Sequence, residues 1–115
     1  MSVNVLPSAI EGRGLFAARA LRPGTVVEVA PVLVVPPQEV DLLDDTLLRW
    51  YVFDWDGTST AVVLGKASMC NHSSTPNAEL FLDDAEDGPV AELVVTRRVR
   101  AGDELLLDYG DEHPL

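Results

Sequence analysis

The sequence predicts a mostly β domain with many turns and little helix. Five short runs are rich in branched or large apolar residues, and most are bounded by Gly, Pro or Asp, which is typical of strands. Only the segment 38–50 has apolar residues near helical spacing, and its leucine stripe is narrow. The expected strands are 26–35, 61–64, 78–82, 90–95 and 104–109.

Two of these strands follow a similar turn. The segments 21-LRPGTVVEV-29 and 99-VRAGDELLL-107 each begin with an apolar residue and Arg, with Gly two positions later. In the first, Pro23 presets its own backbone angle, and Gly24 readily takes the positive φ of a type II turn. The pair is too short and too far apart to indicate a repeat architecture. Both are interpreted as turn-and-strand units of one compact β fold.

The stretch 53-FDWDGTST-60 has two interpretations. Asp-x-Asp-Gly-Thr resembles the first motif of the haloacid-dehalogenase phosphohydrolases, in which Asp54 would be a nucleophile and Asp56 its acid/base partner. That fold needs alternating strands and helices, and the sequence after Asp54 shows no convincing helix. Because Asp-Gly between two β-prone runs is a strong hairpin signal, the stretch is predicted to be a tight turn.

The composition limits the class of protein. With 115 residues, of which 47% are hydrophobic, the chain is long enough for one ordinary small core. Its net charge of −11, from 19 acidic and 8 basic residues, disfavours direct binding to nucleic acid and favours a basic partner such as a Lys-rich tail. The alternative is that the acidic surface serves only solubility.

Cys70 is the only cysteine, so the chain can form no internal disulfide and no multi-cysteine zinc site. No metal site is expected. The first ten residues lack the basic and long apolar regions of a signal peptide, and the longest apolar runs are too short and proline-broken to span a membrane. We therefore expect a soluble, intracellular protein with no membrane partner.

Three separated motifs point to one family. They are 12-GRGLFAARALRPG-24, 70-CNHSSTPNAEL-80 and 101-AGDELLLDYGDE-112. Their order and spacing resemble those of a minimal, viral- or bacterial-like SET domain, the lysine methyltransferase fold that uses S-adenosyl-L-methionine. The resemblance is strongest over 3–112. It implies a single SET domain over 1–115, without a separate pre-SET or a cysteine-rich post-SET segment. The implied fold has several short, curved β-sheets and a knot-like C-terminal arrangement.

The resemblance assigns cofactor-binding roles to the first two motifs. Gly12, Arg13 and Gly14 would let the main chain approach the cofactor closely, since glycine has no Cβ to obstruct it. Asn71 would hold the amino or carboxylate end of the methionine part with its side-chain amide. His72 would meet the adenine mainly through its backbone, and its imidazole is expected to be satisfied by main-chain partners.

Two tyrosines carry the chemistry that the resemblance implies. The hydroxyl of Tyr109 would lie beside the transferred methyl group, so this residue is expected to be both catalytic and cofactor-binding. Tyr51 matches a second tyrosine that lines the lysine channel in short members. Since the usual pKa of tyrosine is about 10, Tyr109 is better suited to positioning than to taking a proton at neutral pH. Trp50 and Phe53 are expected in the core.

The implied reaction is an in-line displacement, in which a neutral lysine amine attacks the methyl carbon while the sulfonium leaves as a thioether. Lysine has a usual pKa of about 10.4, so its ammonium must first lose a proton. A dry channel and the adjacent sulfonium both favour the neutral amine. Carboxylates are therefore expected at the rim, where they would recruit a basic protein or peptide such as a histone tail. Glu104 and Asp108 are expected to be structural or to steer the substrate weakly.

The segment 110-GDEHPL-115 departs from the family pattern, because no aromatic residue follows Tyr109. The adenine would be covered by His113 or Pro114, by a second subunit, or not at all. His113 is thus a candidate cofactor-binding residue, and a homodimer is a hypothesis. The alternative function is a catalytically inactive SET-like module that binds a basic peptide. The compartment would be the cytoplasm, or the nucleus or host chromatin if the substrate is a histone.

Overall fold

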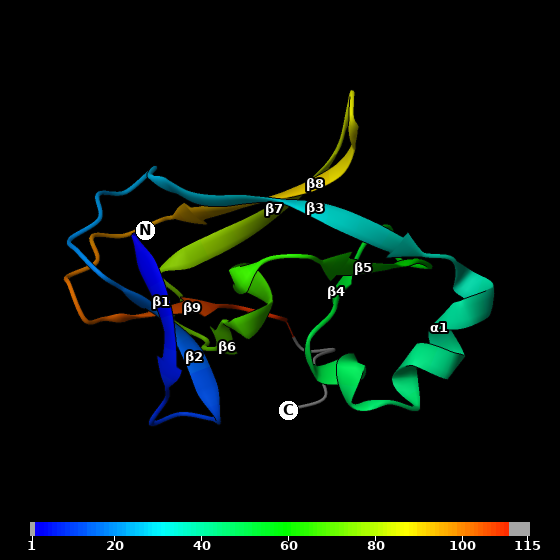
Figure 1. Cartoon of the computed structure of the whole chain (residues 1–115), viewed down its shortest axis with the longest axis horizontal. Coiled ribbons are helices and arrows are strands. Elements are labelled where there is room, and N and C mark those ends of the chain that lie inside the picture. Colours follow the sequence, from blue (N-terminus) through cyan, green and yellow to red (C-terminus); the bar gives the residue numbers. More distant parts are fainter. Residues whose placement is uncertain (1, 111–115) are drawn as a thin grey trace.

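Strands dominate the computed structural model, which describes residues 2–110, and they form two curved sheets (Figure 1). The four-stranded sheet has the order β1 (Val3–Pro7), β2 (Arg13–Ala17), β9 (Glu104–Leu107) and β6 (Asn71–His72). The five-stranded sheet has the order β4 (Phe53–Asp54), β5 (Thr60–Val63), β3 (Val26–Val35), β8 (Gly88–Val95) and β7 (Ala78–Ala85). The prediction of a mostly β fold with short, curved sheets and little helix is confirmed.

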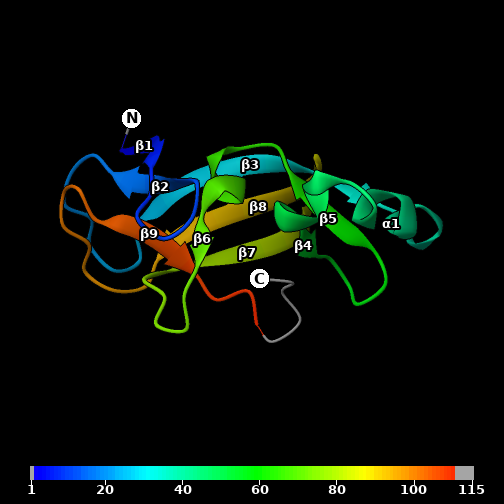
Figure 2. The same ribbon diagram turned by 90° about the horizontal axis from the view of Figure 1, so that it is seen from below.

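The core joins the buried sides of both sheets. Figure 2 shows the five-stranded sheet extending behind β6 and β9. The largest fully buried side chains include Leu15 and Leu105 from the four-stranded sheet and Leu93 from the five-stranded one. Along β3 the burial alternates, so that Ala30 and Val32 enter the core while their neighbours face outward. One side of each sheet is therefore covered, as the apolar alternation requires.

The segment 38–50 forms two short helices where the sequence predicts one. Helix α1 (Pro37–Asp44) ends before Thr46, and the 3₁₀ helix η1 (Leu47–Trp50) begins after it. The Thr46 hydroxyl donates to the Leu43 carbonyl at 2.7 Å and accepts from the Leu48 backbone N–H at 3.2 Å. The helical pattern over 38–50 is thus confirmed, but it is divided into two helices, because Thr46 caps the second one.

The two similar turn-and-strand segments lie against each other. Leu21 and Val99 exchange backbone hydrogen bonds of 2.8 and 3.0 Å. Gly24 and Gly102 follow at φ +87° and +90°, a conformation that side chains with a Cβ rarely adopt. The interpretation of both segments as turn-and-strand units of one fold is confirmed.

The stretch 53-FDWDGTST-60 is a hairpin turn between the antiparallel strands β4 and β5. The Asp54 carboxylate accepts from the Gly57 backbone N–H at 3.0 Å. The Asp56 carboxylate accepts from the backbone N–H groups of Thr58 and Ser59 at 3.0 and 2.7 Å. These bonds, that to Ser59 foremost, lower the pKa of Asp56. The turn prediction is confirmed, and no parallel βα unit carries Asp54 as a phosphohydrolase would require.

Strand β6 is too short to be recognised in the sequence, yet it joins two of the three motifs. It pairs in parallel with β9, so that Asn71 lies opposite Leu106. Asn77 extends this junction with its side chain, which donates to the Glu104 carbonyl and accepts from the Leu106 N–H, both at 2.8 Å. Segments about 30 residues apart in sequence are thereby held in register.

None of the helices in residues 2–110 is long and apolar enough to cross a membrane.

Candidate active site

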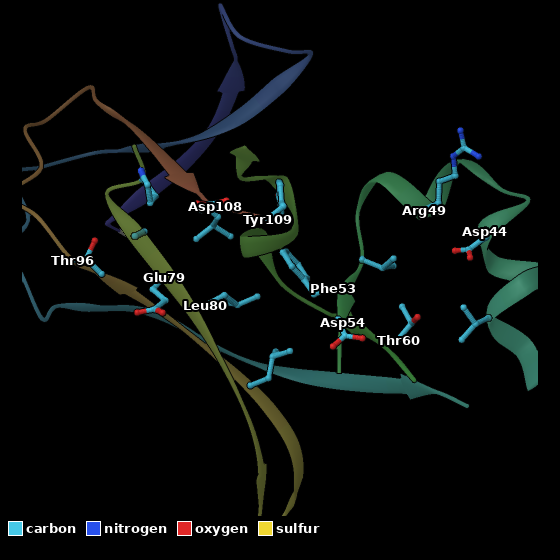
Figure 3. A pocket seen from close by; sticks show the side chains of 16 residues that line it. Asp44, Arg49, Phe53, Asp54, Thr60, Glu79, Leu80, Thr96, Asp108 and Tyr109 are labelled. Carbon is cyan, nitrogen blue, oxygen red and sulfur yellow. The ribbon is translucent and has the colours of Figure 1, made fainter. Parts of the chain in front are cut away.

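Tyr109 lies at the boundary of two cavities. The smaller, of about 230 Å³, is lined by residues from all three sequence motifs, among them Gly12, Arg13, Asn71 and Tyr109, and also by Tyr51. The larger, of about 720 Å³, is lined by residues of η1, β4 and β7 and also by Tyr109 (Figure 3). The structure therefore brings most of the predicted site residues to one place, with the predicted catalytic tyrosine lining both cavities.

Four contacts hold Tyr109 in position. Its hydroxyl donates to the Cys70 carbonyl oxygen, and its backbone N–H donates to Nδ1 of His72 at 3.0 Å. Its ring lies 5.4 Å from the Phe53 ring and stacks on the His72 ring at 5.8 Å, centroid to centroid. Burial, and next the neighbouring Cys70 side chain, raise the pKa of Tyr109 above its usual value. The phenol is thus protonated at neutral pH and its hydrogen is directed at a carbonyl.

A carboxylate on strand β3 helps to position the Cys70 carbonyl through a short helix. Cys70 ends the 3₁₀ helix η2 (Lys66–Met69). The Glu28 carboxylate, on β3, accepts from the backbone N–H groups of Lys66 and Ala67, both at 2.9 Å. Gly65 leaves room for it, since a Cβ there would stand 2.6 Å from a Glu28 oxygen. Glu28 therefore caps η2 at one end, while Cys70 meets Tyr109 at the other.

The Cys70 thiol is not a nucleophile in this arrangement. The residue is buried, and burial followed by the charges of Glu28 and Glu104 raises the pKa of the thiol. Because the thiolate is the reactive form, a protonated thiol of this kind packs as a small apolar side chain. Cys70 contributes to the site through its main-chain oxygen instead.

Asn71 and Glu104 form a polar network beside the smaller cavity. The Asn71 amide nitrogen lies 2.8 Å from the Glu104 carboxylate and 3.1 and 3.2 Å from the carbonyls of Glu11 and Arg13. The other Glu104 oxygen accepts from the Ser8 hydroxyl at 2.7 Å. These acceptors orient the amide group, so its donor nitrogen faces the protein. Within residues 2–110 its carbonyl oxygen has no hydrogen-bond donor.

The two glycines of Gly12-Arg13-Gly14 serve different purposes. Gly12 has φ +44°, faces open space and lines the smaller cavity together with Arg13. Gly14 is buried, and a Cβ there would stand 2.1 Å from a Glu104 oxygen and 3.1 Å from the Asn71 amide nitrogen. Gly14 is therefore required by the polar network, a reason independent of any close approach of the main chain to a ligand.

The His72 ring supports Tyr109. Its Nδ1 accepts the Tyr109 N–H and lies 3.8 Å from an Asp108 oxygen. The Tyr109 backbone N–H is thus a main-chain partner of the His72 ring, of the kind that was expected. His113, the other predicted histidine, lies outside the described residues.

Trp50 and Phe53 are closer to the site than the sequence suggested. Trp50 is half-buried, lines the smaller cavity beside Tyr51, and carries the Arg49 guanidinium 4.7 Å above its ring. Its prediction as a core residue is wrong. Phe53 packs partly on the core, as predicted, and also lines the larger cavity. The sequence did contain a signal for this position of Trp50, because the residue directly precedes Tyr51, the predicted channel tyrosine.

The larger cavity has an acidic wall. Figure 3 shows carboxylates of Asp44, Asp54, Glu79 and Asp108 around it, with Arg49 at one end. Apolar and aromatic residues such as Leu80, Phe53 and Tyr109 line the same cavity. The lining therefore combines carboxylates with apolar and aromatic side chains. Within residues 2–110, no group of three or more His, Cys, Asp or Glu side chains is placed to hold a metal ion.

Curved sheets that bring three motifs to one half-buried tyrosine, which lines two cavities, are consistent with the class of SET-type domains. A family model described as SET domain matches residues 12–110. The chain therefore belongs to the SET-domain family, as the motifs predicted.

Three curated relatives are named as lysine methyltransferases. A Schizosaccharomyces pombe histone-lysine N-methyltransferase, specific for H3 lysine-37, is 29% identical over 96% of this chain and 80% of its own length. Human histone-lysine N-methyltransferase 2B is 30% identical over 94% of this chain but only 4% of its own length. Xenopus laevis N-lysine methyltransferase KMT5A-A is 27% identical over 88% of this chain and 34% of its own length. These names agree with the predicted class of enzyme.

The fold also agrees with a solved structure. A Plasmodium falciparum protein described as a candidate histone methyltransferase superposes with a TM-score of 0.79 over 96% of this chain and 95% of the other, at 21% identity. At this identity the likeness supports the fold. The limits of the domain, predicted as 1–115 without pre-SET or post-SET segments, stay a prediction.

Proposed function

We propose that the protein transfers a methyl group from S-adenosyl-L-methionine to the ε-amine of a lysine in a basic protein. The observation that carries this proposal is the place of Tyr109, which lines two cavities with different sets of neighbouring residues. The smaller cavity is proposed for the methyl donor and the larger for the substrate. Membership of the SET-domain family supports this assignment.

The smaller cavity suits a cationic ligand with an amino-acid end. Its lining carries one acidic residue, Glu11, and one basic residue, Arg13, together with the uncharged polar residues Ser68, Asn71, Tyr51 and Tyr109. Because the Asn71 nitrogen is engaged with protein acceptors, its oxygen is the atom left for a ligand. Asn71 would therefore bind the amino end rather than the carboxylate. S-adenosyl-L-methionine, when bound, supplies an electrophilic methyl group on a positively charged sulfur.

The larger cavity suits a basic peptide. The carboxylates of Asp44, Asp54 and Glu79 would attract a cationic segment, while the apolar and aromatic residues beside Tyr109, such as Phe53 and Leu80, would favour the neutral form of an inserted amine. The presence of several carboxylates in this lining supports the proposal that they steer the substrate. A histone tail is the substrate class suggested by the names of the relatives, and an enzyme acting on it would work on chromatin.

Tyr109 would align the amine without removing its proton. Its phenol is protonated at neutral pH, and its hydrogen points at the Cys70 carbonyl. The hydroxyl can therefore offer an incoming amine only an oxygen lone pair, which orients an amine N–H. In the proposed in-line displacement the amine nitrogen forms the new C–N bond as the methyl leaves sulfur, and the extra proton passes to water. Alignment and exclusion of water supply the rate gain.

The proposal also requires a group that covers the adenine part of the bound cofactor. His113 and a second subunit are the proposed candidates, and Trp50 offers a further aromatic surface at the smaller cavity. A homodimer that completes the site would show as loss of activity on dilution, in parallel with dissociation followed by sedimentation. Full activity of a monomer would exclude it.

The function is tested by transfer of a radiolabelled methyl group from S-adenosyl-L-methionine to core histones and to a Lys-rich non-histone protein. We expect label on lysine, loss of label in Tyr109→Phe, and a thermal shift with S-adenosylhomocysteine in both forms. Peptide binding without any transfer would instead support an inactive SET-like module. Phosphatase activity abolished by Asp54→Asn would support the phosphohydrolase interpretation.

A further inference from the structure

The outer side of the five-stranded sheet is an unpartnered apolar surface. In Figure 1 the strands β3, β8 and β7 run side by side along one side of the molecule, and their hairpin β7–β8 curves away from the rest. Buried residues such as Ala30, Ala91 and Leu93 point inward. Their sequence neighbours point outward, in the opposite direction.

The strand registers arrange these outward residues in rows across the sheet. One row is Val29, Glu92 and Phe81, and the next is Pro31, Val90 and Asp83. A flanking row contains Val26, Val94 and Glu79, and Leu33 follows on β3 at the other end. We call this set the outer face.

The outer face is more apolar than a solvated sheet surface. Val29, Leu33 and Phe81 remain 61%, 57% and 49% exposed. Isolated exposed apolar residues are normal, but a contiguous group of this kind on one sheet marks an interaction site. A single sheet face of this kind is usually buried against another layer.

Its charges all have the same sign. Glu92 is exposed between Val29 and Phe81, and the ends of the rows carry Glu79 and Asp83. The adjoining hairpin tip, 83-DDAEDG-88, adds further exposed carboxylates. None of the paired outward residues in the three rows is basic.

A second copy of this chain is a poor occupant of the outer face. A two-fold contact would place the same carboxylates against an identical acidic surface, and each copy has a net charge of −11. A partner with basic and apolar residues on one surface avoids this repulsion. The neighbouring strands place Glu92 about 5 Å from the apolar residues on either side.

We propose that the outer face binds an amphipathic α-helix of another protein, with an arginine or lysine near the centre of its apolar side. The aliphatic stem of that residue would pack against Val29. Its cationic head would meet the Glu92 carboxylate beside the Phe81 ring, which offers a cation–π contact. Apart from Glu79, which also lines the larger cavity, this docking surface shares no residue with either cavity, and it does not depend on methyl transfer.

The test uses a short helical peptide of leucine and arginine and a twin with glutamate in place of arginine. Amide chemical shifts of isotope-labelled full-length protein locate the binding site, and fluorescence anisotropy measures its affinity. We expect the basic peptide to shift residues of β3, β8 and β7, and the acidic twin not to bind. Glu92→Lys should weaken the basic peptide about tenfold or more.

Asp41→Lys, an equal charge change on the exposed part of α1, is the matched control and should weaken binding less than about threefold. Phe81→Ser tests the apolar part without a charge change, and thermal unfolding verifies that each variant folds. Equal loss in Glu92→Lys and Asp41→Lys, or shifts elsewhere on the protein, would overturn the proposal. A dimer in sedimentation that Phe81→Ser dissociates would show that a second copy covers the outer face.

Discussion

The hairpin turn at 54–59 and the site around Tyr109 differ in how far apart in sequence their hydrogen-bond partners lie. In the turn, the carboxylates of Asp54 and Asp56 accept only from backbone or side-chain groups two or three residues away. Around Tyr109 the partners are far apart in sequence: 39 residues for its hydroxyl and 37 for its backbone N–H. Carboxylates that stabilise their own turn are unavailable for chemistry, whereas long-range contacts bring distant groups to one point.

The largest expected effect concerns the hydroxyl at the centre of the long-range site. Tyr109→Phe removes the group between the Cys70 carbonyl and the proposed amine, so methyl transfer should fall about 10²-fold or more. Binding of S-adenosylhomocysteine should change little, because the ring contacts to Phe53 and His72 remain. Initial rates and a binding titration measure the two quantities. A loss below about threefold would contradict the proposed role.

The next effect comes from the crowded contact between Gly14 and Glu104. Gly14→Ala places a Cβ against the carboxylate, and the overpacking should lower the free energy of unfolding by about 1–3 kcal/mol. Urea unfolding measures this change. The double variant with Glu104→Ala is the control: if the clash is the cause, its loss should be smaller than the sum of the two single losses. Strict additivity would rule the contact out as the reason for Gly14.

A smaller effect is expected at Glu28, which acts on Tyr109 only through η2 and Cys70. In Glu28→Gln one carboxylate oxygen becomes an amide donor facing the backbone N–H groups of Lys66 or Ala67. The tilt of η2 should change and methyl transfer should fall about tenfold, mainly in kcat, with little change in KM for the cofactor. Glu39→Gln, on the exposed first turn of α1, is the matched control. Equal changes in both variants would indicate a general charge effect.

The buried Cys70 thiol predicts a loss of stability in alkali. Its pKa in the folded protein is raised above the usual 9.0, so above about pH 9 the unfolded chain loses the thiol proton first. The unfolded state then binds fewer protons than the folded one, and the free energy of unfolding falls as the pH rises. Urea unfolding at pH 8, 9 and 10 measures the slope. Cys70→Ala should reduce this dependence of the unfolding free energy on pH up to about pH 10. Above about pH 10 the raised pKa of Tyr109 should lower the free energy of unfolding in the same way.

The smallest effect is expected in the turn. Asp56 is fully exposed and serves its own backbone, so Asp56→Asn should leave methyl transfer unchanged within about twofold. The midpoint temperature of thermal unfolding should fall slightly, because the amide oxygen is a weaker acceptor for the Thr58 and Ser59 N–H groups. Loss of activity comparable to that of Tyr109→Phe would remove the contrast between the two regions.

Most of the longer strands are predictable from the amino-acid pattern. The run 26–35 coincides with β3, and the strands expected at 61–64, 78–82, 90–95 and 104–109 overlap β5, β7, β8 and β9. Branched apolar runs between turn residues are a local signal that survives folding. The strands β1, β2 and β6 were missed, because they are short or carry glycine and proline, and β6 pairs with a strand distant in sequence.

Other features were not visible in the apolar pattern. That Thr46 divides the helical segment follows from local hydrogen bonds to Leu43 and Leu48, which the leucine pattern does not show. The capping of η2 by Glu28 joins residues 38 and 39 positions apart. Trp50 lines the smaller cavity together with Tyr51, and its place directly before Tyr51 was the only sequence signal for this. Apolar periodicity and composition predict none of these contacts.

The sequence by itself determined the family and the chemical groups available, because its three motifs and its strand-forming runs are contiguous in the chain. Only the tertiary structure decided which groups are free to act. The orientation of the Asn71 amide, the acceptor of the Tyr109 hydroxyl and the outward position of Glu92 all depend on strand register and tertiary contacts. Register and burial are set by partners tens of residues away, and a local pattern carries no record of them.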